Sequence, residues 1–294
     1  MKIALDWTPN PVHCGTFTAL AKGWFDKAGI DLQLHSPASD QHAVSPAEQL
    51  RLGLSHLAIV PPEEIIKDQL ENKNQLVPLR ALLQYNVTSI AVAANSGITR
   101  PAMLDGKKYA LLNLPWEKEI ITTMVKNDGG KGDIEWVSIP KLEMYQLFFA
   151  GHIDFAWIFD AIEGTEAKNK GLNLIHFKLE DYDIPYGCTT VLAASANAYE
   201  LNKEEITLTL SIMEAGYSLA NIESETAAKA IFNHPQNTYY KDYDLLLQCQ
   251  KAITPYLAAK GDWGYYDDAR MQNFKQWIRE KCIGKGFDKM NLVK

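Results

Sequence analysis

The sequence predicts an α/β protein with two similar lobes around a cleft and two strands that cross between the lobes. Three observations favour this fold class. Strand and helix patterns alternate along the first two thirds of the chain, which is typical of mostly parallel sheets. The chain has 294 residues, roughly twice the ~150 residues of a typical domain. A short helix–glycine–strand pattern occurs once in each predicted half.

The repeated pattern is visible in the letters of the sequence. Residues 50–53 (LRLG) precede the apolar run 56–60, and residues 148–151 (FFAG) precede the apolar run 154–158 at the same spacing. In both segments a glycine stands where the helix is expected to end, and glycine readily adopts the left-handed conformation of such an end. The two copies occur in the same order within each half, so we expect two lobes of one architecture.

The first half of the chain alternates strands with helices. We expect strands at Lys2–Asp6, Ile30–Leu34, His56–Val60, Leu79–Gln84 and Ser89–Ala94. We expect helices at Phe17–Lys27, Pro46–Gly53 and Pro62–Leu70. Gly29 closes the first helix, and Pro62 lies in the first turn of the third, where proline is common.

The second half repeats this order and then changes character. We expect strands at Lys108–Leu112, Glu135–Ser138, Asp154–Ile158 and Thr189–Ser195. We expect helices from Pro115 to about Asn127 and at Leu142–Gly151, followed by long amphipathic helices at Lys203–Asn221, Glu223–Phe232, Asp242–Leu257 and Asp267–Lys281.

These elements predict a discontinuous first lobe of residues 1–95 and 188–294, and a second lobe of residues 96–187. The crossing strands are expected near residues 86–96 and 187–195, and the C-terminal helices are expected to return to the first lobe. Ligands of open α/β sheets bind beyond the carboxyl ends of the strands, so two such lobes facing each other would form a ligand cleft.

Composition excludes several classes of protein. Hydrophobic residues make up 47% and charged residues 22% of the chain, a balance typical of a globular protein. No window approaches the ~18 uninterrupted apolar residues of a membrane span, so we expect no membrane insertion. The net charge of −7 and the scattered basic residues disfavour a nucleic-acid partner. The four cysteines have no C-x-x-C spacing and favour a reducing compartment, although one or two disulfides remain compatible with the sequence.

The start of the chain predicts a location. Met1 and Lys2 lead directly into a predicted strand, with no apolar leader segment and no cleavage site. We therefore expect a cytoplasmic protein. The alternative is a periplasmic or lipid-anchored protein whose leader has been removed.

The first candidate ligand residues follow the first strand. Trp7 offers a flat apolar face and an N–H group, Asn10 an amide donor and acceptor, and His13 a ring at the start of a helix. Each has a structural alternative, as a core aromatic or a helix-start residue. Three such side chains in one strand-end turn favour contact with a ligand.

Two further strand ends supply candidates. Pro62 and Glu63 follow the third strand, although an acidic residue in a first helical turn is also explained by the helix dipole. Asn113 and Trp116 follow the first strand of the second half. Backbone N–H groups at that helix start could hold an anion, but Glu117 and Glu119 would repel one, so we expect a neutral or cationic ring there.

The last strand of the second half ends in aromatics interleaved with carboxylates. Trp157, Asp160 and Glu163 suit a stacked ring that bears exocyclic N–H donors, and Tyr186 adds an aromatic before the return crossing. Asp160 is equally explained as the N-cap of the next helix. We expect Trp7 and either Trp116 or Trp157 to sandwich the ring.

No catalytic signature stands out. The sequence has no G-x-S-x-G, no P-loop, no G-x-G-x-x-G and no His, Cys or carboxylate spacing typical of zinc or iron sites. We therefore predict no catalytic residues, no metal ligands and no cofactor.

Several motifs together carry a family resemblance over most of the chain. They are residues 5–13 (LDWTPNPVH), 19–25 (ALAKGWF) with 29–31 (GID), 97–98, 104–108, 150–154 (AGHID), and Gly264-Tyr265 with Phe274 and Trp277. The chain resembles the thiamine-pyrimidine group of periplasmic-binding-protein-like folds. This group includes ThiY-type formylaminopyrimidine-binding proteins and fungal hydroxymethylpyrimidine phosphate synthases. The resemblance implies a type II binding-protein fold with a small heteroaromatic ligand between its lobes.

The chain also departs from the synthases that it resembles. Those enzymes carry a Lys that holds pyridoxal phosphate and a His that is consumed as substrate, on the segment matching Leu57–Ile65, where this chain has neither residue type. Their cysteine-rich iron motif matches the stretch from Pro185 to Val191, in which only Cys188 is a cysteine. Synthase activity is therefore disfavoured.

The leading hypothesis is a protein that binds a thiamine-precursor pyrimidine or a related aromatic amine, with a transporter as partner if it is exported. One alternative is a synthase-like or pyrimidine-modifying enzyme that uses other residues. Another is a sulfonate or nitrate receptor of the same fold, which the acidic residues Glu117 and Glu119 disfavour.

Overall fold

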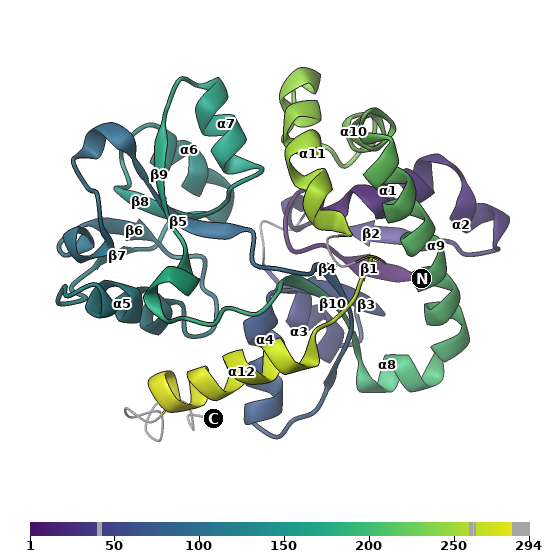
Figure 1. Cartoon of the computed structure of the whole chain (residues 1–294). Coiled ribbons are helices and arrows are strands. Elements are labelled where there is room, and N and C mark those ends of the chain that lie inside the picture. Colours follow the sequence, from purple (N-terminus) through teal and green to yellow (C-terminus); the bar gives the residue numbers. More distant parts are fainter. Residues whose placement is uncertain (40–42, 259–260, 262, 284–294) are drawn as a thin grey trace. The chain divides into compact units, whose positions relative to one another are not determined.

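The computed structural model describes residues 1–39, 43–258, 261 and 263–283, which form two compact units (Figure 1). Unit 1 comprises Met1–Val87, Asp160–Asn169 and Cys188–Tyr266. Unit 2 comprises Thr88–Phe159, Lys170–Gly187 and the described residues 267–283. Each unit contains one mixed β-sheet with helices packed on it.

The strands occur in chain order as follows: β1 (Lys2–Ala4), β2 (Gln33–His35), β3 (Leu57–Val60), β4 (Leu76–Leu83), β5 (Thr88–Ala93), β6 (Lys108–Ala110), β7 (Glu135–Val137), β8 (Phe155–Phe159), β9 (Leu174–Phe177) and β10 (Thr189–Ser195). The expected strands are present at these places with small shifts of their ends. The strand β9 was not expected.

The α-helices are α1 (Cys14–Ala21), α2 (Trp24–Lys27), α3 (Pro46–Arg51), α4 (Pro62–Leu70), α5 (Glu117–Asn127), α6 (Met144–Phe149), α7 (Glu163–Asn169), α8 (Ala196–Leu201), α9 (Lys203–Ile222), α10 (Ser224–Phe232), α11 (Tyr243–Leu257) and α12 (Asp268–Ile278). Short 3-10 turns are η1 (Pro11–His13), η2 (Pro37–Ser39), η3 (Ala94–Ser96), η4 (Pro101–Leu104), η5 (Lys141–Glu143) and η6 (Leu179–Tyr182), and η7 (Arg279–Ile283) is a π-helical turn.

Sheet A, in unit 1, has the strand order β2-β1-β3-β10-β4. The strand β1 pairs in parallel with β2 and β3, and β10 runs antiparallel to β3 and β4. The strands β1, β3 and β4 therefore end at the same edge of the sheet, and β10 begins there. This edge is where an α/β sheet binds its ligand.

Sheet B, in unit 2, repeats this arrangement with the order β7-β6-β8-β5-β9. The strand β6 pairs in parallel with β7 and β8, and β5 runs antiparallel to β8 and β9. The helix–glycine–strand repeats of the sequence correspond to α3–β3 in one sheet and α6–β8 in the other, at equivalent places. The prediction of two α/β lobes of one architecture is confirmed.

The two units differ from the expected division at three segments. The strand β5 belongs to unit 2, because it pairs with β8 and β9, whereas the expected second lobe began at residue 96. Residues 160–169, with α7, belong to unit 1, and residues 267–283 belong to unit 2. The chain therefore also passes between units at residues 159/160, 169/170 and 266/267, beyond the two crossings that the sequence predicted.

The helix α12 belongs to unit 2 because its apolar residues pack there. The Phe274 ring lies 4.8 Å from the ring of Tyr186, between centroids. The sulfur of Met271 lies so close to Gly187 that a side chain at that glycine would overlap it. The helices α9, α10 and α11 belong to unit 1, as expected. Residues 284–294, which the expected division placed in the first lobe, lie outside the described residues.

Two helices differ from the sequence-based expectation for local backbone reasons. The helix expected over Phe17–Lys27 is divided into α1 and α2 at Gly23, whose φ of 66° ends the first helix. The helix expected to begin at Pro115 begins at Glu117, because Trp116 has a left-handed φ of 56°. Each change therefore depends on one residue with a positive φ, Gly23 in the first case and Trp116 in the second.

The helices of unit 1 pack closely on one another. The contact between α1 and α9 is close because Gly15 and Gly216 face each other, and a Cβ at Gly216 would overlap the carbonyl oxygen of Gly15. The core strands of sheet A contribute fully buried apolar residues such as Ile3, Leu57 and Val191. Among the described residues, no helix has the length and apolar character needed to cross a bilayer.

Candidate functional site

The turn after β1 places a carboxylate at the binding edge of sheet A. The His13 ring nitrogen Nε2 lies 2.8 Å from Oδ1 of Asp6, and His13 is fully buried while the Asp6 side chain is 20% exposed. The backbone N–H of Asn10 donates to Nδ1 of His13 at 3.4 Å. Nδ1 therefore accepts, Nε2 carries the proton, and the histidine donates to Asp6. The second oxygen of Asp6 has no hydrogen bond among the described residues.

Asn10 and His13 shape this turn from within. The Asn10 side-chain oxygen accepts from the Val12 N–H at 2.8 Å, and its NH2 group donates to the carbonyl of Thr8 at 3.1 Å. Asn10 and His13 thus form a reciprocal cap at the start of η1. Their polar atoms are used to hold the turn, and the group that the turn presents is Asp6, which the sequence-based prediction did not select. The signal was a carboxylate at a strand end with a histidine seven residues later.

The same turn is fixed to the helices of unit 1 by a buried tyrosine. Tyr217 of α9 donates from its hydroxyl to the carbonyl of Val12 at 2.8 Å, and its ring stacks on Trp263 with centroids 4.0 Å apart. Burial, with the negative charges that Cys14 and Asp6 can carry, raises the pKa of Tyr217 well above 10. Tyr217 therefore remains a neutral donor. Trp7, the next residue after Asp6 in the chain, is partly exposed.

The candidates after β3 have structural explanations in the folded chain. Pro62 opens α4, and Glu63 is fully buried in the first turn of that helix, where the dipole favours its charge. The neighbouring Glu64 forms an ion pair with Arg51, with 3.0 Å between Oε2 and Nη2. Glu63 is therefore an interior residue of unit 1.

Glu163 begins α7 and faces a buried polar cluster in unit 1. Its charge, with that of Glu166, adds to burial in raising the pKa of Cys249 to about 12. Burial is also the main reason that the pKa of Tyr240 lies well above 10, and the charges of Glu163 and Glu166 raise it further. Tyr239 donates to Glu166 at 2.7 Å. Because α7 begins at Glu163, Asp160 lies too early to be its N-cap, and the Asp160 N–H donates to the carbonyl of Val87 at 3.2 Å.

In unit 2, Glu117 organises the loop that carries Asn113 and Trp116. The Glu117 carboxylate is buried and accepts from the Tyr109 hydroxyl at 2.7 Å. It also accepts from the N–H groups of residues 112, 113 and 114 at 2.8, 2.9 and 3.3 Å. Burial raises the pKa of Glu117 above its ordinary value, against the lowering effect of these donors. Both Asn113 and Trp116 have positive φ, 60° and 56°.

The aromatics Trp157 and Tyr186 belong to the interior of unit 2. The Trp157 indole N–H donates to the hydroxyl of Thr88 at 2.8 Å, and the residue is 4% exposed. Its ring meets that of Tyr186 edge-on at 5.4 Å, and Tyr186 in turn packs against Phe274. Trp157 is therefore held by sheet B, and Trp116 is the aromatic candidate at the end of β6.

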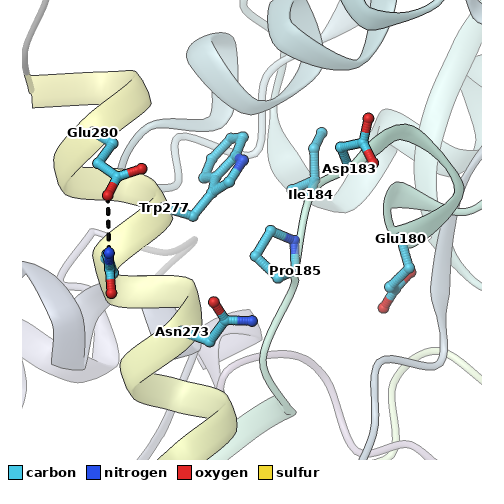
Figure 2. A pocket seen from close by; sticks show the side chains of 8 residues that line it. Glu180, Asp183, Ile184, Pro185, Asn273, Trp277 and Glu280 are labelled. Carbon is cyan, nitrogen blue, oxygen red and sulfur yellow. Dashed lines mark hydrogen bonds between the residues drawn. The ribbon is translucent and has the colours of Figure 1, made fainter.

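Unit 2 also contains an open pocket of about 500 Å³ that the sequence did not indicate. Figure 2 shows it between the segment 180–185 and α12. Its lining combines three carboxylates, two amides and three apolar side chains: Glu180, Asp183, Glu280, Asn273, Gln276, Ile184, Pro185 and Trp277. The Gln276 amide donates to Glu280 at 2.9 Å. None of the predicted ligand residues lines this pocket.

Known proteins that are similar to the chain include two relatives in sequence and one solved structure. A Haemophilus influenzae protein whose name associates it with thiamine biosynthesis is 24% identical over 289 residues, 96% of this chain and 87% of the relative. A formylaminopyrimidine-binding protein of Halalkalibacterium halodurans is 24% identical over 194 residues, 63% of this chain and 55% of the relative. The periplasmic aliphatic sulphonate-binding protein SsuA of Escherichia coli has a similar structure, with a TM-score of 0.61 and 17% identity over 95% of this chain and 86% of that chain.

These similarities bear on two predictions. The likeness to SsuA confirms the periplasmic-binding-protein fold that the resemblance implied. The expected cytoplasmic location gains no support, because SsuA is described as periplasmic. A family model described as NMT1/THI5 like matches residues 10–227, well over half of the sequence. The chain belongs to the NMT1/THI5-like family.

Proposed function

We propose that the chain is a binding protein for a small heteroaromatic ligand, a thiamine-precursor pyrimidine that bears an exocyclic amine. The ligand would lie at the carboxyl edge of sheet A, with a ring face on Trp7. The name of the formylaminopyrimidine-binding relative supports this ligand class. Glu163, which also belongs to unit 1, is proposed as a further carboxylate toward the amine.

One observation carries the proposal, namely the partly exposed Asp6 carboxylate that His13 orients at the end of β1. An amine on an aromatic ring donates N–H groups in the plane of the ring. A carboxylate with one oxygen held by the protein offers the other as a charge-assisted acceptor, which is stronger than a neutral one. Such a pair, next to a tryptophan, suits an aminopyrimidine better than an anion.

A sulfonate or nitrate ligand is disfavoured by the loop after β6. Three consecutive backbone N–H groups ahead of α5 are the kind of donors that hold an anion. In this chain they donate to the Glu117 carboxylate instead. An external anion would have to displace a buried carboxylate that belongs to the same helix.

Enzymatic synthesis of the pyrimidine is the less favoured alternative. On residues 57–65, the segment that matches the lysine and histidine of the synthases, β3 is followed by Pro61 and the first residues of α4, and none of these residues is a lysine or a histidine. Cys188 is buried at the place of the synthase cysteine motif. No side chain on these segments could form a Schiff base.

Calorimetric titration of the full chain tests the proposal directly. The probes are a formylaminopyrimidine, 4-aminopyrimidine, aniline and an alkanesulfonate. We expect the two aminopyrimidines to bind and the alkanesulfonate not to bind. Binding of the sulfonate alone would contradict the proposal and would favour the receptor class represented by SsuA.

Two variants connect binding to the proposed residues. Trp7→Ala should weaken every ring ligand, and Glu163→Gln should weaken amine-bearing rings selectively, by about 30- to 150-fold for a buried charged hydrogen bond. Trp24→Ala on α2 and Glu204→Gln on the exposed side of α9 are the matched controls and should bind as wild type does. If neither test variant weakens binding, the ligand site lies elsewhere.

An exported location would make a membrane transporter the partner of this protein. The similarity to a protein described as periplasmic supports this location. Fractionation of the native cells, with detection of the chain by antibody, separates the two locations. Recovery with cytoplasmic markers alone would contradict export.

A further inference from the structure

Thr190, near the start of β10, has an unusual backbone conformation. Its φ is 54°, in the left-handed region that glycine favours. Asparagine and aspartate tolerate this region and account for most of the described non-glycine residues found there. A β-branched side chain crowds the backbone in this region, so Thr190 is a genuine outlier. Such residues persist where the surrounding structure holds them, and they are enriched at ligand sites.

The Thr190 side chain has a second unusual property. The residue is 6% exposed, and its hydroxyl is buried without a hydrogen-bond partner among the described residues. The preceding Thr189 shows the opposite behaviour. Its hydroxyl donates to the carbonyl of Tyr85 at 3.1 Å and accepts from the N–H of Val87 at 3.1 Å. A buried hydroxyl without a partner destabilises the folded protein, so a bound molecule that supplied one would remove a real cost.

The topology places Thr190 at the binding edge of sheet A. Val191 pairs with Val60, the last residue of β3, so Thr190 stands opposite the residue that follows β3. Ala4 pairs with Ala58 on the other side of β3. If the β1–β3 register continued for two residues beyond Ala4, Asp6 would stand in the row of Val60 and Val191, one row from Thr190. Since β3 lies between β1 and β10, these two strands are about 10 Å apart, twice the spacing of neighbouring strands.

This distance matches a single aromatic ring with a hydrogen bond at each side. Asp6, two residues after the end of β1, has a carboxylate oxygen that can accept an exocyclic N–H. Thr190, on β10, brings a hydroxyl that can donate, and an aminopyrimidine has ring nitrogens that accept. At the edge of the sheet, Asp6 thus offers an acceptor for the amine and Thr190 a donor for a ring nitrogen.

We propose that Thr190 is a ligand-contacting residue of unit 1, and that its hydroxyl donates to a ring nitrogen of the aminopyrimidine that Asp6 holds through the amine. The inference rests on the proposed function and adds the group that distinguishes a nitrogen heterocycle from a carbocyclic amine. Asp6 alone would accept any aromatic amine. Thr190 would make the site specific for a ring with an acceptor nitrogen.

The test is calorimetric titration of the full chain with two probes, a formylaminopyrimidine and its aniline counterpart, in which carbon replaces the ring nitrogens. Thr190→Val removes the hydroxyl and keeps the branched shape. Thr190→Gly also removes it and accepts the φ of 54°, so this variant decides the question if the valine variant does not fold. Thr190→Ser keeps the hydroxyl. Thr209→Val is the control, because the hydroxyl of Thr209 on α9 is also buried without a hydrogen-bond partner among the described residues.

We expect Thr190→Val and Thr190→Gly to lose about tenfold or more in affinity for the pyrimidine. Their affinity for the aniline should be unchanged, and Thr190→Ser and Thr209→Val should bind the pyrimidine nearly as wild type does. If the wild-type chain binds the pyrimidine and both the Val and the Gly variant bind it with undiminished affinity, this inference is overturned while the proposed function stands. A serine variant as weak as the valine variant, or an equal loss in Thr209→Val, also overturns it. A wild-type chain that binds no aminopyrimidine overturns the proposed function and this inference together.

Discussion

His13 and Asp6 form a buried-to-surface pair in which the ring nitrogen Nε2 lies 2.8 Å from the carboxylate oxygen Oδ1. The histidine is fully enclosed, whereas a fifth of the aspartate side chain remains exposed. One oxygen of Asp6 is therefore fixed from inside unit 1, and the carboxylate has a defined direction at the edge of sheet A. The hydrogen bond from His13 thus orients the Asp6 carboxylate and leaves its second oxygen able to accept from a ligand.

The first prediction concerns Asp6. Asp6→Asn keeps an oxygen that can accept from His13, so the free energy of unfolding should change by less than about 1 kcal/mol. The affinity for aminopyrimidines should fall about 30-fold or more, because a neutral amide replaces the charged acceptor. Calorimetric titration measures the affinity, and urea unfolding measures the stability. Asp26→Asn on the exposed side of α2 is the control, and equal affinities in both variants would remove Asp6 from the site.

The second prediction separates Trp157 of unit 2 from Trp7 of unit 1. Trp157→Phe loses the indole N–H bond to Thr88 and should destabilise the chain by about 1–2 kcal/mol without changing affinity for ring ligands. Trp7→Ala should weaken every ring ligand. The two effects are compared by thermal unfolding and by titration with 4-aminopyrimidine. A loss of affinity in Trp157→Phe that exceeds the loss in Trp7→Ala would reverse this assignment.

The third prediction concerns the buried carboxylate of Glu117. Glu117→Gln replaces an acceptor oxygen by an NH2 group that faces backbone donors, so unfolding free energy should fall by about 2 kcal/mol. Glu119→Gln, on the exposed side of the same helix, should have little effect. Urea unfolding of both variants at neutral pH provides the comparison. Equal stabilities would show that Glu117 does not hold the loop.

The fourth prediction follows from the direction of the Glu117 pKa. Burial raises this pKa in the folded chain, so the folded state binds the proton more tightly than the unfolded state. The contribution of Glu117 to stability is therefore largest below its unfolded pKa of about 4.3 and decreases as pH rises through the raised folded value. The stability difference between wild type and Glu117→Gln should shrink over that window. A difference that grows with pH there would contradict the raised pKa.

The fifth prediction concerns thiol reactivity. Burial is the main reason that the pKa values of Cys14 and Cys249 rise to about 12, so both remain thiols near neutral pH. The thiolate is the reactive form. In the native chain neither should react with a disulfide reagent at neutral pH, and both should react after unfolding. Peptide mapping by mass spectrometry identifies the labelled cysteines, and rapid labelling of either one in the native state would contradict the burial.

Part of this structure was determined by local sequence pattern. Alternating strand and helix signals, and the repeat at residues 50–60 and 148–158, were sufficient to predict two α/β lobes of one architecture. Strand ends were located well enough to direct attention to the turn after β1 and the loop after β6. These features depend on periodicity and on glycine at helix ends, which act within a few residues.

The sequence by itself thus determined the fold class, the strand ends and the absence of the synthase lysine and histidine from residues 57–65. Only the tertiary structure decided that β5 belongs to sheet B, that Glu117 turns inward to its own loop, and that Asp6 is the side chain which the first turn presents. The sequence likewise did not predict the positive φ of Thr190 or its buried hydroxyl without a hydrogen-bond partner among the described residues. The reason is physical: strand pairing, burial and hydrogen-bond satisfaction join residues that are distant in sequence, whereas sequence patterns report only the preferences of neighbours.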